Sequence, residues 1–335
     1  MFKRRTKSNS NEKGIAELFE ISLGSEKQWL LIRGEDVNNP ILLFLHGGPG
    51  TTNIGIAATT QKELEKDFIV VNWDQLGAGL SFRKGISKDT MTLDKMVEYT
   101  KELMAYLLER FDHNKLYLVG HSWGSLLGIM TAKKYPQYIE KYVGVSQFAG
   151  GNESEKYAYD YCIKMAKQTQ NKKALIQLKQ IGVPPYKDWM QGLRIRSTWS
   201  SKLGGTVKTG NLQKIYIKNM LLNTEYHFMD LYKFLAGFTF SLSSLWPEVM
   251  KINLYEHVSE LTVPAYFFLG KYDYTAPSIL AEKFIENLKA PLKEIIWFND
   301  SAHMCTIEEP VKFNTMLVEI LKKTSKKNPQ VIASR

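Results

Sequence analysis

Residues 120–124 read Gly-His-Ser-Trp-Gly and place Ser122 between two glycines in the spacing G-x-S-x-G. The apolar run KLYLV precedes this pentapeptide, and the helical pattern LLGIMTAKKY follows it. A serine on a tight turn from a strand to a helix projects its hydroxyl above the sheet, and small residues on both sides let the turn close. With these flanks the pattern predicts that Ser122 is a nucleophile, whereas the pentapeptide alone would indicate only an ordinary turn.

A serine hydroxyl needs a general base, and that base needs a carboxylate to orient it. Of the six histidines, only His303 comes after the apolar run EIIWF, in the loop FNDSAHMC. Asp273 stands just beyond the preceding apolar run, and serine, acid, histidine is the order expected in a sheet of this kind. We therefore expect Asp273 to orient His303, with Asp300 as the rival acid. Taken singly, Asp273 could instead cap a helix and His303 could lie in a surface loop.

Attack on a carbonyl also needs hydrogen-bond donors for the negative charge that develops on its oxygen. The segment His-Gly-Gly-Pro-Gly at 46–50 follows the run ILLFL, and glycines let backbone N–H groups approach a ligand closely. We expect the backbone N–H groups of Gly48 and Trp123 to form this oxyanion hole. The alternative for 46–50 is a tight turn without function.

The candidate residues follow runs of apolar and β-branched residues, which we expect to be strands. Several of these runs are apolar on successive residues, which is typical of strands covered on both faces of a parallel sheet. Helical spacing separates them, so the sequence predicts an α/β fold with a mostly parallel, doubly wound sheet. The expected strands are 28–33, 41–46, 68–73, 116–119, 142–147, 265–269 and 294–298, and the expected helices are 92–111, 124–134, 278–288 and 309–323.

Residues 148–258 interrupt this alternation with helical patterns and no convincing strand run. We expect them to form a helical lid inserted into a catalytic domain of residues 14–147 and 259–321, with basic tails at 1–13 and 322–335. The expected lid helices are 154–169, 172–181, 211–222 and 226–237. Lid aromatic residues could line an apolar pocket or simply pack its helices; they are Tyr226, Phe228, Tyr232, Phe234, Phe238, Phe240 and Trp246.

The 335-residue chain has 44 basic and 34 acidic residues and a formal net charge of +10. The two tails carry +9 of this charge, the lid carries +7 and the catalytic domain −6. A basic face for nucleic acid is therefore not needed to explain the composition, and we expect no nucleic-acid or membrane partner. Cys162 and Cys305 form no metal-ligand pair, so we expect no metal. Since no apolar stretch suits a signal peptide or a membrane span, we expect a cytoplasmic protein of unknown oligomeric state.

Together these motifs resemble the α/β-hydrolase fold and, within it, the proline iminopeptidase (prolyl aminopeptidase) family. The resemblance rests on HGGPG at 46–50, DQLGAGLS at 74–81, GHSWGS at 120–125 and the two later loops, and it covers roughly 25–150 and 260–320. It implies a cofactor-free enzyme that removes an N-terminal residue, often proline, from small peptides. The implied triad is Ser122, Asp273 and His303.

Two features depart from the family pattern. The family usually has an arginine where this chain has Leu76. The family also holds the free ammonium group of its substrate with acidic residues, some from the lid, whereas this lid is basic. Glu225 is the first candidate for that role and Glu153 the second, and an exposed position at the start of a helix is the alternative for Glu225.

Three functions remain open from the sequence. The first is a serine peptidase that releases N-terminal residues from a short peptide through an acyl-enzyme. The second is a serine esterase, lactonase or amidase that acts on a small uncharged or anionic substrate with the same residues. The third is a receptor that keeps the fold without catalysis, against which the complete set of motifs argues.

Overall fold

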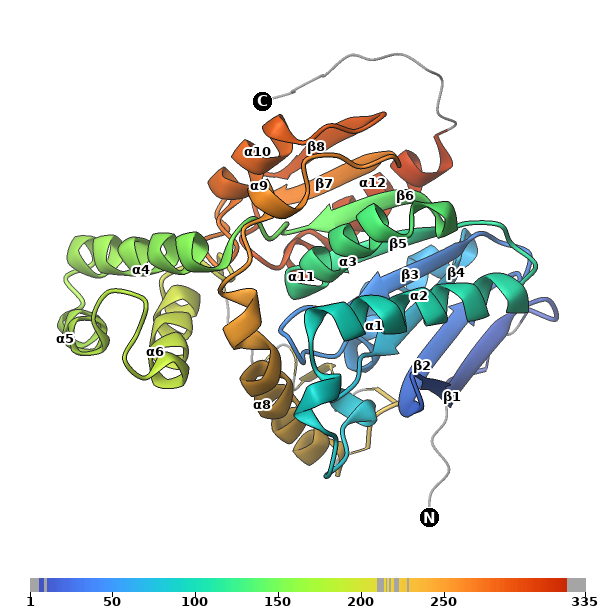
Figure 1. Cartoon of the computed structure of the whole chain (residues 1–335), viewed down its shortest axis with the longest axis horizontal. Coiled ribbons are helices and arrows are strands. Elements are labelled where there is room, and N and C mark those ends of the chain that lie inside the picture. The colour runs from blue at the N-terminus through green and yellow to red at the C-terminus, as the bar shows by residue number, and fades with distance from the viewer. Residues whose placement is uncertain are drawn as a thin grey trace.

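A computed structural model describes residues 6–8, 11–209, 214, 216, 218–219, 223–227 and 229–323. Its centre is an eight-stranded sheet in the order β1-β2-β4-β3-β5-β6-β7-β8 (Figure 1). β1, β2 and β4 pair antiparallel in succession, and all later neighbours are parallel. The strands are β1 (Ile15–Leu23), β2 (Glu26–Gly34), β3 (Ile41–Leu45), β4 (Ile69–Asp74), β5 (Leu116–His121), β6 (Ile139–Val145), β7 (Ala265–Gly270) and β8 (Lys293–Phe298). The mostly parallel α/β sheet is confirmed.

Each expected strand overlaps an observed one, but β1 was not predicted. This strand lies at the edge of the sheet and has glutamates at positions 17 and 20 among its apolar residues. Most of its side chains are half-buried, because only one neighbouring strand and one face cover it. Edge strands tolerate charge for this reason, and the mixed pattern hides the strand from a search for continuous apolar runs.

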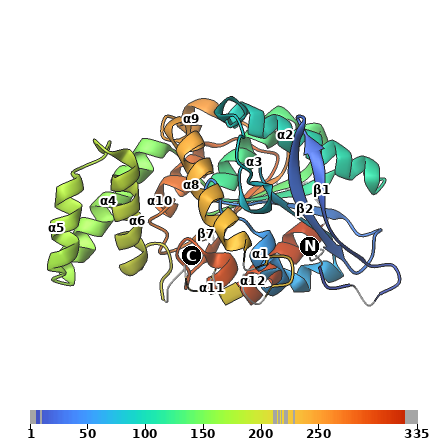
Figure 2. The ribbon, with the colours of Figure 1, turned by 90° about the horizontal axis from the view of Figure 1, so that it is seen from below.

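Helices cover both faces of the sheet, as a doubly wound fold requires. One large apolar core joins the sheet to α2 (Leu93–Arg110), α3 (Trp123–Lys134) and α10 (Ser278–Asn287). A second core on the opposite face joins it to α12 (Pro310–Lys322), and the two layers are seen edge-on in Figure 2. These four helices confirm the four that were expected outside the lid. Two short helices complete this part of the molecule, α1 (Ile54–Thr60) and α11 (Cys305–Glu308).

The segment between β6 and β7 contains helices and no sheet strand among its described residues. Figure 1 shows α4, α5 and α6 grouped at one side of the sheet, with α8 packed separately nearer to β1 and β2. The helices are α4 (Gly151–Gln168), α5 (Lys172–Ile181), α6 (Trp189–Lys202), α8 (Asp230–Val249) and α9 (Leu254–His257). α4 and α5 confirm two expected helices, and α8 begins four residues later and ends twelve residues later than expected. The helix expected at 211–222 lies largely outside the described residues.

α6 was missed, because Gly192 and its serine-rich end lower its intrinsic helix propensity. Its packing shows why it is nevertheless helical. Arg196 and Glu155 of α4 form a buried ion pair, and Trp199 belongs to a core that joins α4, α5 and α6. A side chain at Gly192 would collide with the Tyr186 ring, so this glycine is required by tertiary contact.

Candidate active site

Ser122 lies on the turn between β5 and α3 and has φ 55° and ψ −116°, a conformation that non-glycine residues rarely adopt. Its N–H donates to the Val145 carbonyl at 2.9 Å, which anchors the turn to β6. The two glycines of the motif have no room for a side chain. A Cβ at Gly120 would lie 2.1 Å from the Gly124 carbonyl oxygen, and one at Gly124 would lie 2.1 Å from that of Leu45. The turn therefore has the geometry of a nucleophile elbow, with Ser122 half-buried at its tip.

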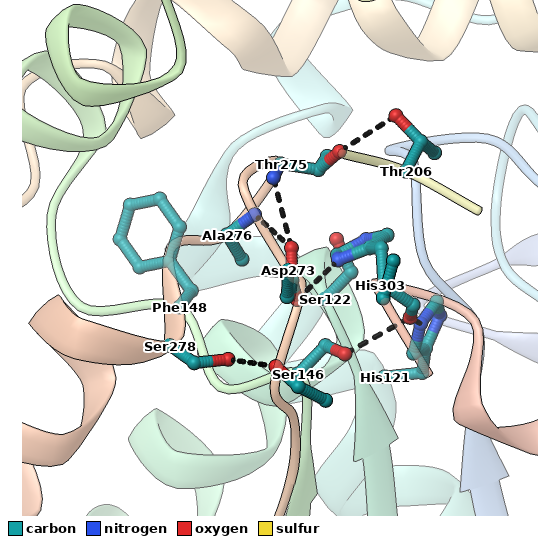
Figure 3. Close-up of polar contacts among 12 residues, drawn as sticks. His121, Ser122, Ser146, Phe148, Thr206, Asp273, Thr275, Ala276, Ser278 and His303 are labelled. Carbon is teal, nitrogen blue, oxygen red and sulfur yellow. Dashed lines mark hydrogen bonds and ion pairs between the residues drawn. The ribbon is translucent and has the colours of Figure 1, made fainter. Parts of the chain in front are cut away.

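His303 and Asp273 lie beside this serine, at the carboxyl ends of β8 and β7 (Figure 3). His303 Nδ1 is 2.8 Å from Asp273 Oδ2, and the exposed fractions of the two residues are only 5% and 3%. The other carboxylate oxygen of Asp273 accepts the backbone N–H groups of Thr275 (2.8 Å) and Ala276 (2.9 Å). A carboxylate at Nδ1 keeps the proton on that nitrogen and leaves Nε2 free to accept one.

Asp300, the rival acid, lies in a different environment. Its side chain is 78% exposed and pairs with Lys208 at 2.9 Å. This ion pair lowers the pKa of the Asp300 carboxyl. The structure thus brings Asp273, and not Asp300, into contact with the His303 ring.

Two side chains fix the backbone of the histidine loop. The carbonyl oxygen of His303 accepts His121 Nε2–H at 2.9 Å and the Ser146 hydroxyl at 2.9 Å (Figure 3). His121 stands immediately before Ser122, so the nucleophile turn and the histidine loop are joined directly. Burial lowers the pKa of His121 to about 4, so this imidazole is neutral at physiological pH.

The glycine-rich segment 46–50 lies against Ser122. A Cβ at Gly47 would be 3.0 Å from His121 Nδ1 and 3.3 Å from Ser122 Cβ, so a larger residue here would have to displace the turn by a few tenths of an ångström. Neither of the two expected oxyanion donors, the N–H groups of Gly48 and Trp123, has a backbone acceptor within the described part of the chain. Since the Trp123 N–H belongs to the first turn of α3, it has no partner within that helix.

Gln75 connects the two halves of the expected oxyanion hole. Its backbone N–H donates to His46 Nε2 at 3.1 Å, and its side-chain oxygen accepts the Trp123 indole N–H at 2.9 Å. Because Nε2 of His46 is an acceptor, Nδ1 carries the proton and donates to the Gly47 carbonyl at 2.9 Å. Burial lowers the pKa of His46 to about 4, which keeps this tautomer neutral. Sequence analysis gave Gln75 no role, although it stands in the DQ pair at 74–75.

Asp74, the other member of that pair, is completely buried and accepts three hydrogen bonds. The donors are the hydroxyls of Thr52 and Tyr226 and the backbone N–H of Leu80 at 2.8 Å. Burial raises the pKa of this carboxyl to about 6 in spite of these donors. Tyr226 precedes α8, so Asp74 ties the lid segment to the end of β4.

Neither acid expected to bind an ammonium group is seen in contact with the triad residues. Glu225 is 1% exposed, so its alternative placement as an exposed helix-start residue is wrong. Its carboxylate accepts the hydroxyls of Thr6 (2.5 Å) and Thr224 (3.3 Å), and Thr6 in turn accepts from Arg33 of β2. Glu153 is exposed in the first turn of α4.

The lid aromatic residues have no common location. Tyr226 is buried against Asp74, whereas Tyr232 is 62% exposed. Trp246 lines a cavity of about 180 Å³ with Tyr186 and Trp189, between α4 and the end of α8. Phe234, Phe238 and Phe240 are half-buried, and Phe228 lies outside the described residues.

No cluster of three or more histidine, cysteine, aspartate or glutamate side chains suited to a metal ion occurs within the described ranges. Cys162 and Cys305 are both buried free thiols, and burial raises the pKa of Cys162 to about 12 and that of Cys305 further. A buried thiol with a raised pKa is a poor nucleophile, so neither cysteine is a candidate for that role. The described helices also include none with the length and apolarity to span a bilayer.

Comparison with known proteins agrees with this fold. A model of the alpha/beta hydrolase fold matches residues 40–198. A probable aminopeptidase of Bacillus subtilis, YbaC, is 37% identical over 306 residues, which cover 91% of this chain and 96% of that protein. The proline iminopeptidase of Heyndrickxia coagulans is 23% identical over 84% of this chain and 90% of its own. The crystal structure of a proline iminopeptidase-related protein from Thermus thermophilus shares the fold with a TM-score of 0.65 at 16% identity, covering 92% of this chain and 97% of its own.

Proposed function

This chain belongs to the proline iminopeptidase-like family of α/β-hydrolases and is a hydrolase, and from that premise we propose that it is a serine aminopeptidase. In this proposal Ser122 is the nucleophile, His303 the general base and acid, and Asp273 the acid that orients His303. The substrate is a short peptide whose N-terminal residue, with proline preferred, is released.

In the first half of the reaction, Ser122 Oγ attacks the carbonyl carbon of the N-terminal residue while His303 Nε2 takes the hydroxyl proton. The negative charge on the carbonyl oxygen is stabilised by the N–H groups of Gly48 and Trp123. The carbon–nitrogen bond of the peptide then breaks, and His303 returns the proton to the departing amine. The product is an acyl-enzyme, an ester between Ser122 and the N-terminal residue.

In the second half, water attacks that ester and His303 takes its proton. The ester bond breaks, Ser122 recovers its proton from His303, and the free amino acid leaves. Asp273 stabilises the imidazolium that forms twice in this cycle, because its Oδ2 is 2.8 Å from the protonated nitrogen Nδ1. No cofactor is needed for either half.

The observation that carries the proposal is the convergence of three loops. Ser122 on its strained turn lies beside a buried His303–Asp273 pair, and the three residues follow three different parallel strands (Figure 3). Evidence for a peptide substrate comes from the name of the 37%-identical relative, a probable aminopeptidase. Proline preference is supported by the more distant proline iminopeptidases.

The test is a set of prolyl, alanyl and leucyl arylamides beside p-nitrophenyl acetate, assayed with the wild-type enzyme and with Ser122→Ala. We expect arylamide hydrolysis, fastest for the prolyl compound, and a loss of at least about 10³-fold in kcat/KM for Ser122→Ala with an unchanged melting temperature. Ser122→Ala activity near that of the wild type would refute the nucleophile. A uniform rate on the arylamides would refute the proline preference.

A serine esterase or amidase is a second candidate, and one specific observation favours it. An aminopeptidase must pair the substrate ammonium with a carboxylate, because an unpaired buried charge is costly. The carboxylate of Glu225 is already bound to two hydroxyls, and Glu153 is exposed. Hydrolysis of the acetate ester with no measurable arylamide hydrolysis would favour this second candidate.

A further inference from the structure

Residues 204–208, which follow α6 of the lid, run between the two loops that carry Asp273 and His303. The N–H of His303 donates to the Thr206 carbonyl at 3.0 Å. The N–H of Tyr274, the residue after Asp273, donates to the Gly205 carbonyl at 3.0 Å. We call residues 204–208 the strap, because it is bonded to both loops through adjacent carbonyl groups.

A side-chain contact strengthens the link to the acid loop. The hydroxyls of Thr206 and Thr275 lie 2.9 Å apart, and the Thr275 backbone N–H donates to Asp273 Oδ1 at 2.8 Å (Figure 3). Thr206 is therefore linked to the His303 ring in three steps. Its hydroxyl bonds to that of Thr275, the Thr275 N–H bonds to Asp273 Oδ1, and Asp273 Oδ2 contacts His303 Nδ1. Both hydroxyls are largely removed from solvent, since Thr206 is only 9% exposed and Thr275 is half-buried.

The strap is equally well attached to the lid. The Gly205 N–H donates to the Ser200 carbonyl at 2.8 Å, and the Thr206 hydroxyl lies 3.2 Å from that of Ser200, in α6. The Tyr161 ring of α4 stacks on the Tyr274 ring with a centroid distance of 3.7 Å. A Cβ at Gly205 would lie 2.6 Å from the Tyr161 ring, so the strap fits this space only with glycine there.

A second connection joins the strap to the histidine loop. The carboxylate of Glu308, in α11, accepts the Lys208 N–H at 2.6 Å and the Ala302 N–H at 2.9 Å. Glu308 thus bridges the end of the strap to the residue before His303. The strap is bonded along its length to α6, to the acid loop and to the histidine loop.

We propose that the strap is a positioning element for the catalytic triad and that Thr206 is its central positioning residue. Thr206 acts without touching the nucleophile or a reacting atom. Its hydroxyl fixes the position of Asp273 through Thr275, and its carbonyl fixes the position of His303 by accepting the His303 N–H. Because catalysis depends steeply on the geometry of these groups, small displacements of either loop slow acylation. The same bonds couple the position of α4 and α6 to the triad. This proposal rests on the serine triad proposed above.

The test replaces the Thr206 hydroxyl by a methyl group of the same shape. We expect Thr206→Val to lower kcat for the best substrate about three- to tenfold, the worth of the buried hydrogen bonds that its hydroxyl makes to Thr275 and Ser200, with KM changed less than about twofold. Thr206→Ser restores the hydroxyl and should restore the rate. Thr198→Val is the matched control, because Thr198 is an exposed threonine of α6 whose hydroxyl bonds only to its own helix.

A second readout separates positioning from substrate binding or folding. Diisopropyl fluorophosphate phosphorylates the active serine: the Ser122 oxygen–phosphorus bond forms, fluoride leaves and His303 takes the proton. The rate of this reaction should fall in Thr206→Val by the same factor as kcat, and remain at the wild-type value in Thr198→Val. Circular dichroism melts identify the temperature at which every variant is folded, and the rates are compared there.

The partner threonine supplies an independent variant should Thr206→Val not fold. Thr275→Val removes the same hydroxyl pair from the other side, together with the 3.3 Å bond from the Thr275 hydroxyl to the Gly205 carbonyl of the strap, and keeps the backbone bond to Asp273. If one hydrogen bond is responsible, the double variant should be no slower than the slower single variant. Phosphorylation at the wild-type rate in a folded Thr206→Val or Thr275→Val, or additive losses in the double variant, overturns the role of the strap. A wild-type enzyme that is not phosphorylated at Ser122 instead overturns the triad.

Discussion

At the scale of single residues, the protonation states around Ser122 follow from which groups donate and which accept. His46 is buried and His121 is half-buried, and both imidazoles are neutral. Each forms a hydrogen bond with the backbone of another motif. Asp273 accepts two backbone N–H groups with one oxygen and faces His303 with the other. The site therefore has one imidazole, that of His303, opposite a carboxylate and beside the serine.

Replacing the two candidate acids separately distinguishes them. We expect Asp273→Asn to lower kcat/KM about 10³- to 10⁴-fold, because an amide no longer holds the imidazole in the required tautomer or balances its charge. Asp300→Asn is the matched control, and it should stay within about twofold of the wild type because an exposed ion pair contributes little. Steady-state kinetics on the best arylamide measure both, and an equal loss in the two variants would contradict the assignment of Asp273.

At the scale of elements, Asp74 joins three parts of the fold at one point. It ends β4 and binds Thr52, which precedes α1, and Tyr226, which precedes α8. Since its folded-state pKa of about 6 lies above its ordinary value of 3.8, the fold favours the protonated carboxyl. Asp74 therefore stabilises the protein most below its ordinary pKa, and this contribution is lost as pH rises through about 6.

Asp74→Asn isolates this effect, because the amide does not titrate. On lowering the pH from 7.5 to 4.5, the wild type should gain about 2 kcal/mol of unfolding free energy relative to Asp74→Asn. Urea unfolding at several pH values measures the difference. Tyr226→Phe removes a hydrogen bond that lowers the Asp74 pKa, so the gain should begin at a higher pH in that variant. If the difference in unfolding free energy between the wild type and Asp74→Asn does not change with pH, this account of Asp74 is contradicted.

At the scale of the whole molecule, the lid packs α8 into the main apolar core and is also bonded to the catalytic domain in two separate regions. The strap attaches α4 and α6 to the loops that carry Asp273 and His303, whereas the segment 223–226, before α8, bonds to α1 and to Asp74 at the end of β4. Glu225 belongs to the second region, where Thr6 links its carboxylate to Arg33 of β2. In the sheet order, β4 and β3 separate β2 from the strand that carries Ser122.

Glu225→Gln tests whether this residue holds the lid edge or the substrate. From its contacts we expect a lower melting temperature and a KM for prolyl arylamides within about twofold of the wild type, since the amide weakens charge-assisted bonds to Thr6 and Thr224. Glu153→Gln, at an exposed position, is the control for stability. A KM that rises about tenfold or more for arylamides but not for acetate esters would instead make Glu225 the ammonium-binding residue.

Much of the fold and the positions of the triad candidates could be predicted because they depend on local patterns. Continuous apolar runs predicted the buried strands from β2 to β8, and parallel strands end at one edge, where Ser122, Asp273 and His303 follow β5, β7 and β8. β1 and α6 escaped prediction, because an exposed edge strand and a helix with poor propensity owe their form to their neighbours.

The sequence by itself determined which residues could do the chemistry and the order of the elements that present them. Only the tertiary structure decided which carboxylate faces His303, that Gln75 joins His46 to Trp123, that Glu225 bonds to Thr6, and that the strap crosses both triad loops. These contacts join residues that are mostly tens or hundreds of positions apart. Their partners are selected by the packing of whole elements, and no pattern within a short stretch of chain records that selection.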